Sequence, residues 1–570
     1  MTKRDADLSQ PLEKLHPNET FKHDSSHLRG TIAEGLEDRI TAGLPSEGDQ
    51  QLLKFHGTYQ EEDRDLRQER RQKRLEPAYE FMLRLRLPGG VCTPEQWLQL
   101  DELAHRYGNG TMRLTTRQTF QFHGVLKWHL KPLLQGVDQV RLDSIAACGD
   151  VNRNVIANAN PFRSEVHRRT WELAQQLSDH LLPKTRAYYE IWLDDQRLAE
   201  GPSEPEEEPL YGKTYLPRKF KIALAVPPDN DVDLFAHDLG LIAIEEAGRL
   251  LGFNVSVGGG MGNTDGDSET YPRLGEVIGF CLPEQVLKVA ETIVAIQRDY
   301  GNRKNRARAR LKYTLDTHGT DWFVTELEKR LGFRLEPRRP FRFTRRTDPV
   351  GWLQGEDGRW HYGLYIDCGR IKGALMEALR TIAQEHSGHI SLTCNQNLIL
   401  TGIEEQDRPR IERLLGEHDL EEQNRITPAR QASFACVAMP TCNLAMAEAE
   451  RYFPRFMERF EELLASVGLK DDEIIVRISG CPNGCARPYL AEIGLTGRAP
   501  GKYNLYLGAS RAGERLSSLY LENIDEGRIF AALTPLLQRY AGEREPGEAF
   551  GDFLARIGWD GTPPAEASTE

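Results

Sequence analysis

Hydrophobic and polar positions along the chain alternate in some segments and follow a helical period in others. In EFMLRLRLPGG (80–90) every second side chain is apolar while Arg84 and Arg86 face the other way, which predicts a strand with one buried face. TFQFHGV (119–125) predicts a second strand. PEQWLQLDELAHRYG (94–108) has apolar residues at helical spacing and ends at a glycine, which predicts a helix. Strands and helices therefore occur close together along the chain.

Two pairs of similar segments indicate an internal duplication. RLTTRQTFQFHGV (113–125) is similar to SLTCNQNLILTGI (391–403): each has Leu-Thr, then a glutamine, then an apolar stretch that closes at glycine. GFNVSVGGG (252–260) is similar to KYNLYLGAS (502–510). Because the two pairs occur in the same order, duplication is favoured over chance similarity. We expect two related halves, of which the second alone has cysteines in its proline-containing loop.

Length and composition predict a multidomain globular protein. The chain has 570 residues, of which 39% are hydrophobic and 28% charged, enough for roughly three or four domains. No apolar run is long enough to span a bilayer, and the N-terminus lacks the apolar region of a secretory signal. We therefore expect a cytoplasmic protein with reduced cysteines. Residues 1–79 are polar and weakly periodic, which favours an extension or partner-binding arm.

The charge is acidic overall but locally basic. A net charge of −13 argues against a general nucleic-acid-binding protein. Positive side chains nevertheless gather in three runs, RQERRQKR (67–74), RKNRARARLK (303–312) and RRPFRFTRR (338–346). Each run is either a solvated surface or part of an electropositive cavity for an anionic ligand. The sequence leaves both interpretations open.

The nine cysteines fall into two groups. Five are scattered, and we expect them to be small buried apolar residues: Cys92, Cys148, Cys281, Cys368 and Cys394. The other four form two pairs, Cys436-x5-Cys442 and Cys481-x3-Cys485. Two pairs of thiols can close a four-thiolate site. Zinc usually has ligand pairs separated by about two to four residues, so the wider first pair favours an iron–sulfur cluster over zinc, and a reducing compartment disfavours a disulfide.

The sequence around these cysteines suits a cluster. Residues 443–468 have apolar side chains at helical spacing, so we expect a helix that begins directly after Cys442 and favours its thiolate through the helix dipole. In RISGCPNGCARP (477–488), Gly480 and Gly484 permit close approach of the backbone, and Asn483 can donate hydrogen bonds to sulfur.

Several motifs resemble the sulfite and nitrite reductases that use sirohaem. ACVAMPTCNLAMAEAER and RISGCPNGCARPYLAEIGL resemble the cluster signature of this family. RLTTRQTFQFHG, DVNRNVIANANP, TYLPRKFK, FHGTYQEEDRD and GEAFGDF extend the resemblance over nearly the whole chain. It implies an α+β fold with duplicated sulfite/nitrite reductase repeats related by a pseudo-two-fold axis, and three mixed α/β domains around a central sirohaem–cluster site. The expected segments are 1–79, a polar extension; 80–145 with 346–420, a ferredoxin-like domain of two half repeats; 146–345, the first repeat on the substrate side; and 421–570, the second repeat with the cluster.

The resemblance also implies the cofactors and the residues that bind them. A 4Fe–4S cluster is expected on Cys436, Cys442, Cys481 and Cys485, and Cys485 is expected to be the sirohaem iron ligand as well. The expected oxyanion-binding residues are Arg84, Arg153, Lys219 and Lys221. The expected contacts to sirohaem and its carboxylates are Arg113, Thr115, Arg117, Gln121, His123 and Asn483. The spacing of Lys219 and Lys221 independently places both on one face of a strand.

The activity implied by the resemblance is six-electron reduction of sulfite to sulfide, in sulfate assimilation and cysteine biosynthesis. Electrons are expected from NADPH through a separate flavoprotein (alpha) subunit that contains FAD and FMN, and residues 1–79 are a candidate docking arm for it. GGGMGNTDG (258–266) lacks the context of a nucleotide-binding motif, which agrees with a separate donor chain. A sirohaem nitrite reductase is the alternative within the family, and a zinc-stabilised binding protein is the alternative of another class. No nucleic acid and no membrane are expected as partners.

Overall fold

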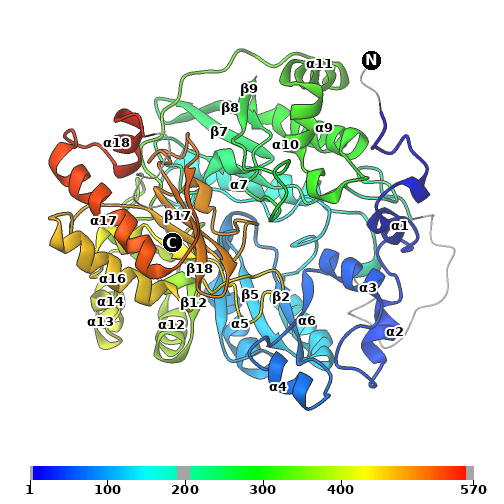
Figure 1. Cartoon of the computed structure of the whole chain (residues 1–570), viewed down its shortest axis with the longest axis horizontal. Helices are drawn as coiled ribbons and strands as arrows, with labels where there is room; N and C mark the ends of the chain where they lie inside the picture. The colour runs from blue at the N-terminus through cyan, green and yellow to red at the C-terminus, as the bar shows by residue number, and fades with distance from the viewer. Residues whose placement is uncertain (1–3, 189–205, 560–570) are drawn as a thin grey trace.

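Two five-stranded sheets are built from matching segments of the chain. The computed structural model describes residues 4–188 and 206–559 (Figure 1). The first sheet has the order β1 (Thr58–Glu62), β2 (Tyr79–Arg84), β5 (Phe120–Val125), β4 (Met112–Leu114) and β12 (Arg370–Ile371). The second has the order β10 (Gly351–Gln354), β11 (Trp360–Leu364), β14 (Leu398–Ile403), β13 (His389–Leu392) and β3 (Val91–Cys92). Each sheet ends on a short strand from the other half, β12 or β3, so strand exchange joins the two halves.

The remaining two sheets also correspond to one another. One contains β6 (Ile222–Ala225), β7 (Leu239–Glu246), β8 (Arg249–Val257) and β9 (Glu276–Cys281). The other contains β15 (Phe434–Ala435), β16 (Val476–Ser479), β17 (Ile493–Ala499), β18 (Lys502–Leu507) and β19 (Ser518–Ile524). In both, a parallel pair is followed by an antiparallel hairpin. The loop after the first strand of each parallel pair leads to a left-handed residue, Asp233 (φ 50°) or Arg487 (φ 56°). The expected duplication is confirmed.

Helices surround these sheets, as Figure 1 shows. The helix expected over 94–108 is α5 (Pro94–Tyr107), and a capping box between Thr93 and Gln96 fixes its start. The others are α1 (Pro17–His23), α2 (Ile32–Glu37), α3 (Glu47–Leu52), α4 (Arg67–Gln72), α6 (Leu130–Gln139), α7 (Glu165–His180), α9 (Val286–Tyr300), α10 (Leu311–His318), α11 (Thr320–Leu331), α12 (Gly373–Glu385), α13 (Arg408–Glu417), α14 (Leu420–Gln423), α15 (Pro428–Gln431), α16 (Phe453–Ser466), α17 (Glu526–Glu543) and α18 (Phe550–Arg556). Over residues 4–188 and 206–559, none of the helices has the length and apolar character required to cross a bilayer.

The helix expected directly after Cys442 begins later than the sequence predicts. Residues 443–452 form turns, and α16 starts at Phe453 with Pro454 in its first turn. The backbone N–H groups of Met446 and Ala447 donate to the Gly480 carbonyl at 2.7 and 3.0 Å, so they are not available to a helix. Cys442 therefore does not lie at a helix N-terminus, and the expected dipole stabilisation of its thiolate is wrong.

The N-terminal segment packs against the body of the protein, where Figure 1 shows it in dark blue. Leu28, Ile32 and Leu53 are fully buried in the main core. Lys22 Nζ donates to the Leu216 carbonyl at 2.6 Å and forms an ion pair with Glu19 at 2.7 Å. The N-terminal segment is therefore polar in composition but is held to the body of the protein by buried residues. A role for this segment in docking, and the division of the chain into four segments, stay predictions.

Candidate active site

Two loops of the second half bring the four paired cysteines together. Cys436 directly follows β15, and Cys481 and Cys485 lie in the loop after β16, which pairs in parallel with β15. The Gly480 N–H donates to Cys436 Sγ at 3.3 Å. A side chain at Gly480 would lie 2.5 Å from the Ala438 Cβ, so the close approach of the two loops requires glycine here.

The thiols lie close enough to influence each other's ionisation. Burial, with the neighbouring Cys485, raises the pKa of Cys436 to about 12. Burial, with Glu61 and the nearby cysteines, raises the pKa of Cys442 well above its ordinary value. Four adjacent thiolates therefore require a positive centre. A donor set made only of thiols, contributed by two loops, fits an iron–sulfur cluster.

The corresponding positions of the first half hold oxygen and nitrogen groups instead of thiols. Asp231 stands where the second half has Cys485, since both precede the left-handed residue of their loop by two positions. Asn158 corresponds to Cys436 of the second half. In each half, a buried glutamine side chain donates a hydrogen bond to the backbone carbonyl of the residue directly before this position. These first-half residues line a separate cavity of about 420 Å³. The duplication therefore supplies one four-thiol set, in the second half.

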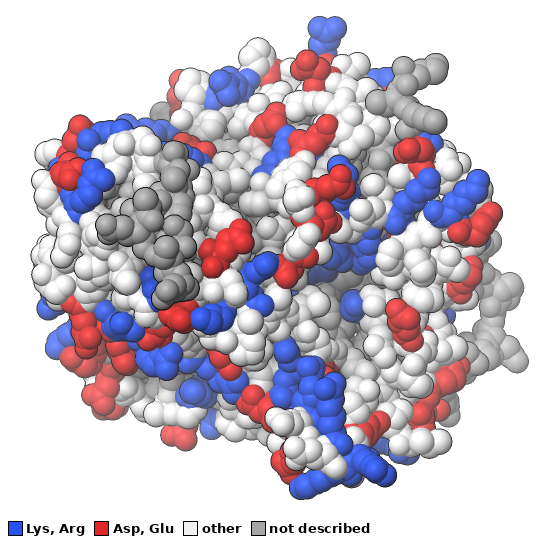
Figure 2. Space-filling model, viewed as in Figure 1, with Lys and Arg blue, Asp and Glu red and all other residues white. Residues whose placement is uncertain are grey.

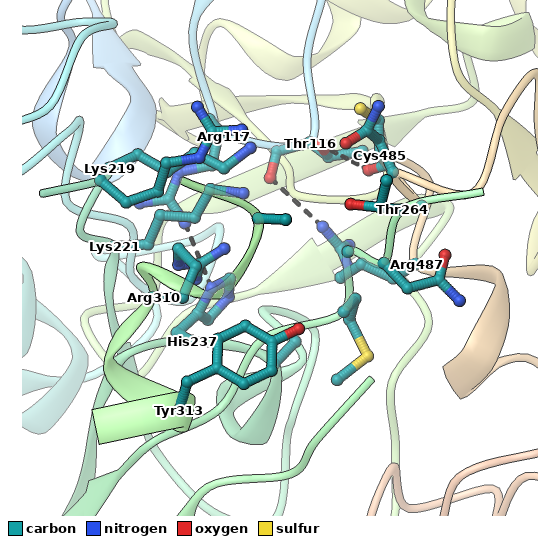
Figure 3. A pocket seen from close by; sticks show the side chains of 18 residues that line it. Thr116, Arg117, Lys219, Lys221, His237, Thr264, Arg310, Tyr313, Cys485 and Arg487 are labelled. Carbon is teal, nitrogen blue, oxygen red and sulfur yellow. Dashed lines mark hydrogen bonds between the residues drawn. The ribbon is translucent and has the colours of Figure 1, made fainter. Parts of the chain in front are cut away.

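A second cavity opens against Cys485, the cysteine with an exposed side chain (Figure 3). Its cationic wall comes from the β4–β5 turn, the segment before β6, the start of α10 and the cysteine loop. The residues are Arg117, Arg218, Lys219, Lys221, Arg310 and Arg487, joined by Thr116, His237, Tyr313 and Asn483. In Figure 3, Arg117, Lys219 and Lys221 lie on one side and Cys485 on the other. The cavity thus joins both halves of the protein.

Much of this positive charge has no counter-charge in the described residues. Arg310 pairs with Asp238 at 2.7 Å, but Arg117, Arg218, Lys219 and Lys221 form no ion pair among residues 4–188 and 206–559. Burial lowers the pKa of Lys219 and Lys221 well below their ordinary value, and neighbouring cations lower it further. Burial likewise lowers the pKa of Arg117 to about 9. Its Nε is buried without a partner. A cavity whose positive side chains outnumber the carboxylates beside them is suited to bind an anion.

A buried carboxylate fixes the loop that carries Cys485. Asp233 accepts from Arg346 Nη2 at 2.6 Å, from Arg477 Nη1 at 2.5 Å and from Arg487 Nε. Burial alone would raise the pKa of Asp233, but the three guanidinium groups hold it well below its usual range. Asp233 and Arg487 occupy equivalent positions in the two halves, so this ion pair crosses the pseudo-two-fold axis.

The structure places the expected substrate residues in two groups. Lys219 and Lys221 line the cavity, with the expected cofactor contacts Arg117, Asn483 and Cys485. Arg153 donates to the Gly149 carbonyl at 3.1 Å and lowers the pKa of both lysines. Arg84 Nη1 contacts Cys148 Sγ at 3.0 Å. Arg84 and Arg153 are therefore not part of the lining of this cavity.

The remaining expected contacts lie mostly on the β4–β5 hairpin. Arg113 donates to Glu450 at 3.0 Å and to the Ala435 carbonyl at 3.1 Å, so it supports the backbone that leads to Cys436. Both ring nitrogens of His123 are buried and form no hydrogen bond among the described residues, although Nδ1 lies 3.8 Å from Glu61 Oε2. Gln121, with its amide oxygen turned to Arg84, accepts from that side chain at 2.6 Å.

Thr115 and Thr116 have different roles in the β4–β5 turn. Thr115 Oγ1 accepts from the Arg117 N–H at 3.2 Å and shapes the turn. Thr116 lines the cavity and donates to the Cys485 carbonyl at 3.4 Å. Thr116 is therefore an additional cavity residue, and the role of Thr115 as a cofactor contact stays a prediction.

Several cavity residues were missed by the sequence interpretation. Arg310 belongs to a basic run that the sequence did not assign to cavity or surface. The glycine-rich segment, set aside as a nucleotide motif, supplies Met261, Gly262, Asn263 and Thr264. Lys312 Nζ holds it by donating to the Gly262 carbonyl at 2.8 Å. Arg218 and His237 carried no signal that separated them from ordinary polar residues.

The duplicated α+β fold and the cationic cavity beside four thiols define a redox protein of the sulfite/nitrite reductase kind. Residues 173–335 match the model described as the nitrite and sulphite reductase 4Fe-4S domain. Residues 73–140 and 353–418 match the nitrite/sulfite reductase ferredoxin-like half domain. The chain belongs to the nitrite and sulphite reductase family.

Full-length relatives place the chain more closely within this family. It is 57% identical over 554 residues to a protein of Chromohalobacter salexigens, with 96% of each chain covered. It is 56% identical over 555 residues to a protein of Myxococcus xanthus, with 97% of this chain and 98% of the relative covered. Both relatives bear the name sulfite reductase (NADPH) hemoprotein beta-component. The solved structure of Mycobacterium tuberculosis NirA has the same fold, with a TM-score of 0.77 and 21% identity over 96% of this chain and 97% of that one.

Proposed function

We propose that this chain is the haemoprotein component of an NADPH-dependent assimilatory sulfite reductase, which reduces sulfite to sulfide with six electrons. The observation that carries the proposal is the position of Cys485, a member of the four-thiol set that also forms part of the wall of a cavity with uncompensated positive charge. The name of the full-length relatives supports the same activity.

Cys436, Cys442, Cys481 and Cys485 would hold a 4Fe–4S cluster, and Cys485 would also bind the iron of sirohaem. When bound, the two groups supply electrons to the substrate. The chain's own residues provide the charge that such a ligand requires, because sirohaem carries eight carboxylates and the free cations of the cavity match them. Arg113, Thr115, Arg117, Gln121, His123 and Asn483 would position the cofactors, together with Thr116, which lines the cavity.

Lys219 and Lys221 would bind the sulfite oxyanion. Arg84 and Arg153, which do not line the cavity, would add positive charge near it. Each S–O cleavage requires protons to release water. Lysines whose pKa is lowered by burial give up a proton more readily than arginines, which remain charged. We therefore assign proton delivery to Lys219 and Lys221 and charge stabilisation to the two arginines.

A separate flavoprotein that oxidises NADPH would supply the electrons. The word beta-component in the name of the relatives supports a partner chain. The four-segment division, with residues 421–570 as the cluster-bearing repeat, and a cytoplasmic location belong to the same proposal.

A visible absorption spectrum and a sulfite-dependent oxidation assay with reduced methyl viologen test the proposal together. Sirohaem coupled to a cluster absorbs strongly in the visible range, whereas a zinc protein is colourless. A higher kcat/KM for sulfite than for nitrite is expected. The opposite preference would assign the chain to nitrite reduction, and a colourless, iron-free protein would overturn the redox function.

A further inference from the structure

Exposed apolar side chains lie on both sides of α4 and in the loop that carries Cys442. Leu444, two residues after Cys442, is 65% exposed. Leu66, directly before α4, is 40% exposed, and Leu75, three residues after its end, is 51% exposed. These are three of the six large hydrophobic residues that are exposed in the described part of the chain. Apolar side chains concentrated in one region of a surface indicate a contact site.

Direct contacts join α4 and the Cys442 loop into one surface. Arg64 Nη1 donates to the Cys442 carbonyl at 3.1 Å and to the Ala445 carbonyl at 2.6 Å. Asn443 Nδ2 donates to the Gln60 carbonyl at 3.2 Å. Arg451 pairs with Asp65 at 2.6 Å. The segment before α4 therefore holds the backbone of the proposed cluster ligand Cys442 in place, and the surface over it is continuous with α4.

This surface is also basic. Arg71 and Arg74 are exposed and form no ion pair among residues 4–188 and 206–559, and Arg70 Nε contacts only the backbone carbonyl of Glu76. Figure 2 shows lysine and arginine side chains gathered over the place that α4 occupies in Figure 1. The whole chain carries a net charge of −13, so a local basic surface stands out against its own background. Such a surface attracts an acidic partner.

We propose that Leu66, Arg70, Arg71, Arg74, Leu75 and Leu444, which we call the α4 patch, dock the electron-donating flavoprotein through an acidic surface that surrounds its exposed flavin. This inference rests on the proposed function and names where its partner binds. A donor that sits on the α4 patch lies over the Cys442 loop, so its flavin approaches the cluster rather than the anion cavity. Apolar contacts at the centre supply affinity, and the arginines steer the approach.

Two variants of the loaded holoprotein test the proposal, Arg71→Glu/Arg74→Glu and Leu444→Ser. The matched control is Arg338→Glu/Arg342→Glu, which makes the same charge change at two exposed arginines of another basic run. Binding of the purified flavoprotein is measured by titration calorimetry at low and high salt. Sulfite reduction is measured once with NADPH and flavoprotein and once with reduced methyl viologen, which needs no docking surface.

The charge-reversal variant should bind the flavoprotein about tenfold more weakly at low salt, with a smaller loss at high salt because ions screen the attraction. Leu444→Ser should weaken binding at both salt concentrations. Both variants should reduce sulfite with methyl viologen at the wild-type rate, and the control variant should bind the flavoprotein with wild-type affinity. Unchanged affinity in both α4-patch variants, or an equal loss in the control, would overturn the docking assignment. Failure of the wild type to reduce sulfite with methyl viologen would instead contradict the proposed function.

Discussion

Replacing Asp233 by asparagine tests the ion cluster at the pseudo-two-fold axis. The substitution keeps the shape of the side chain but removes the negative charge that Arg346, Arg477 and Arg487 share. Arg346 and Arg477 have 0% and 1% of their side-chain surface exposed, so water cannot replace the lost charge. Three guanidinium groups would remain buried with less counter-charge than they have now.

The expected loss follows from the burial of these partners. Removing one member of a buried ion pair costs about 3–5 kcal/mol, and we take about 4 kcal/mol because the asparagine oxygen still accepts a hydrogen bond. With an unfolding entropy of about 2.1 cal/mol/K per residue, this lowers the Tm by about 3 °C if the chain unfolds as one unit. The lowering is larger if the region around the axis unfolds separately.

Asp229→Asn is the matched control. Asp229 also has two arginine partners, but the side chains of Arg163 and Arg345 are 45% and 54% exposed. Solvent screening limits the contribution of such pairs to about 1 kcal/mol or less. Differential scanning calorimetry of both variants, with equal cofactor loading at pH 7, compares them directly. A Tm of Asp233→Asn no lower than that of Asp229→Asn would refute the reasoning.

The pH dependence gives an independent check. The pKa of Asp233 in the folded protein lies well below that of an unfolded aspartate, which is about 3.9. A depressed carboxyl pKa contributes stability that is complete above the unfolded pKa and is lost as the pH falls through the folded pKa. The difference between wild type and Asp233→Asn should therefore be constant from about pH 5 to pH 8 and decrease only in stronger acid.

Three further predictions concern the site and its counterpart. Lys219→Met should lower kcat for sulfite with methyl viologen more than it raises KM; an unchanged kcat would rule out proton delivery by Lys219. Cys485→Ser should remove the visible absorption of both cofactors and lower the iron content, whereas Cys368→Ser should keep both; retained sirohaem and cluster in Cys485→Ser would contradict the shared ligand. Burial, with Asp348 and Asp229, raises the pKa of Asp231 to about 8. Ionisation of this carboxyl group is therefore less favourable in the folded than in the unfolded protein, and the free energy of unfolding should fall progressively from about pH 4 to pH 8. Asp231→Asn should flatten this slope in denaturant titrations across that range, and an unchanged slope would refute the assignment.

Local patterns were sufficient to predict several elements of the fold. Alternation located β2 and β5, and the helical spacing of apolar residues with the glycine that follows them located α5. Internal similarity predicted that segments 113–125 and 391–403 correspond, and the structure shows that they form the matching hairpins β4–β5 and β13–β14. These features depend on neighbouring residues, so the sequence contains the information directly.

Features that depend on distant partners could not be predicted in this way. The start of α16 is delayed because Met446 and Ala447 donate to Gly480, which lies far along the chain. The basic run at 303–312 contains Arg306, which pairs with Asp150, and Arg310, which faces the cavity. Nothing in their local sequence separates these two arginines, because only the folded chain places Asp150 beside one of them.

The two halves have diverged in a way that divides the chemistry between them. Where the second half has Cys436 and Cys485, the first has Asn158 and Asp231, so a cluster fits one side alone. The first half instead contributes the lysines before β6 to the shared cavity. At the axis the equivalent residues are an aspartate and an arginine, which attract each other, whereas identical residues would have repelled. Divergence at Asp233 thus joins the halves and fixes the loop that brings Cys485 to the cationic wall.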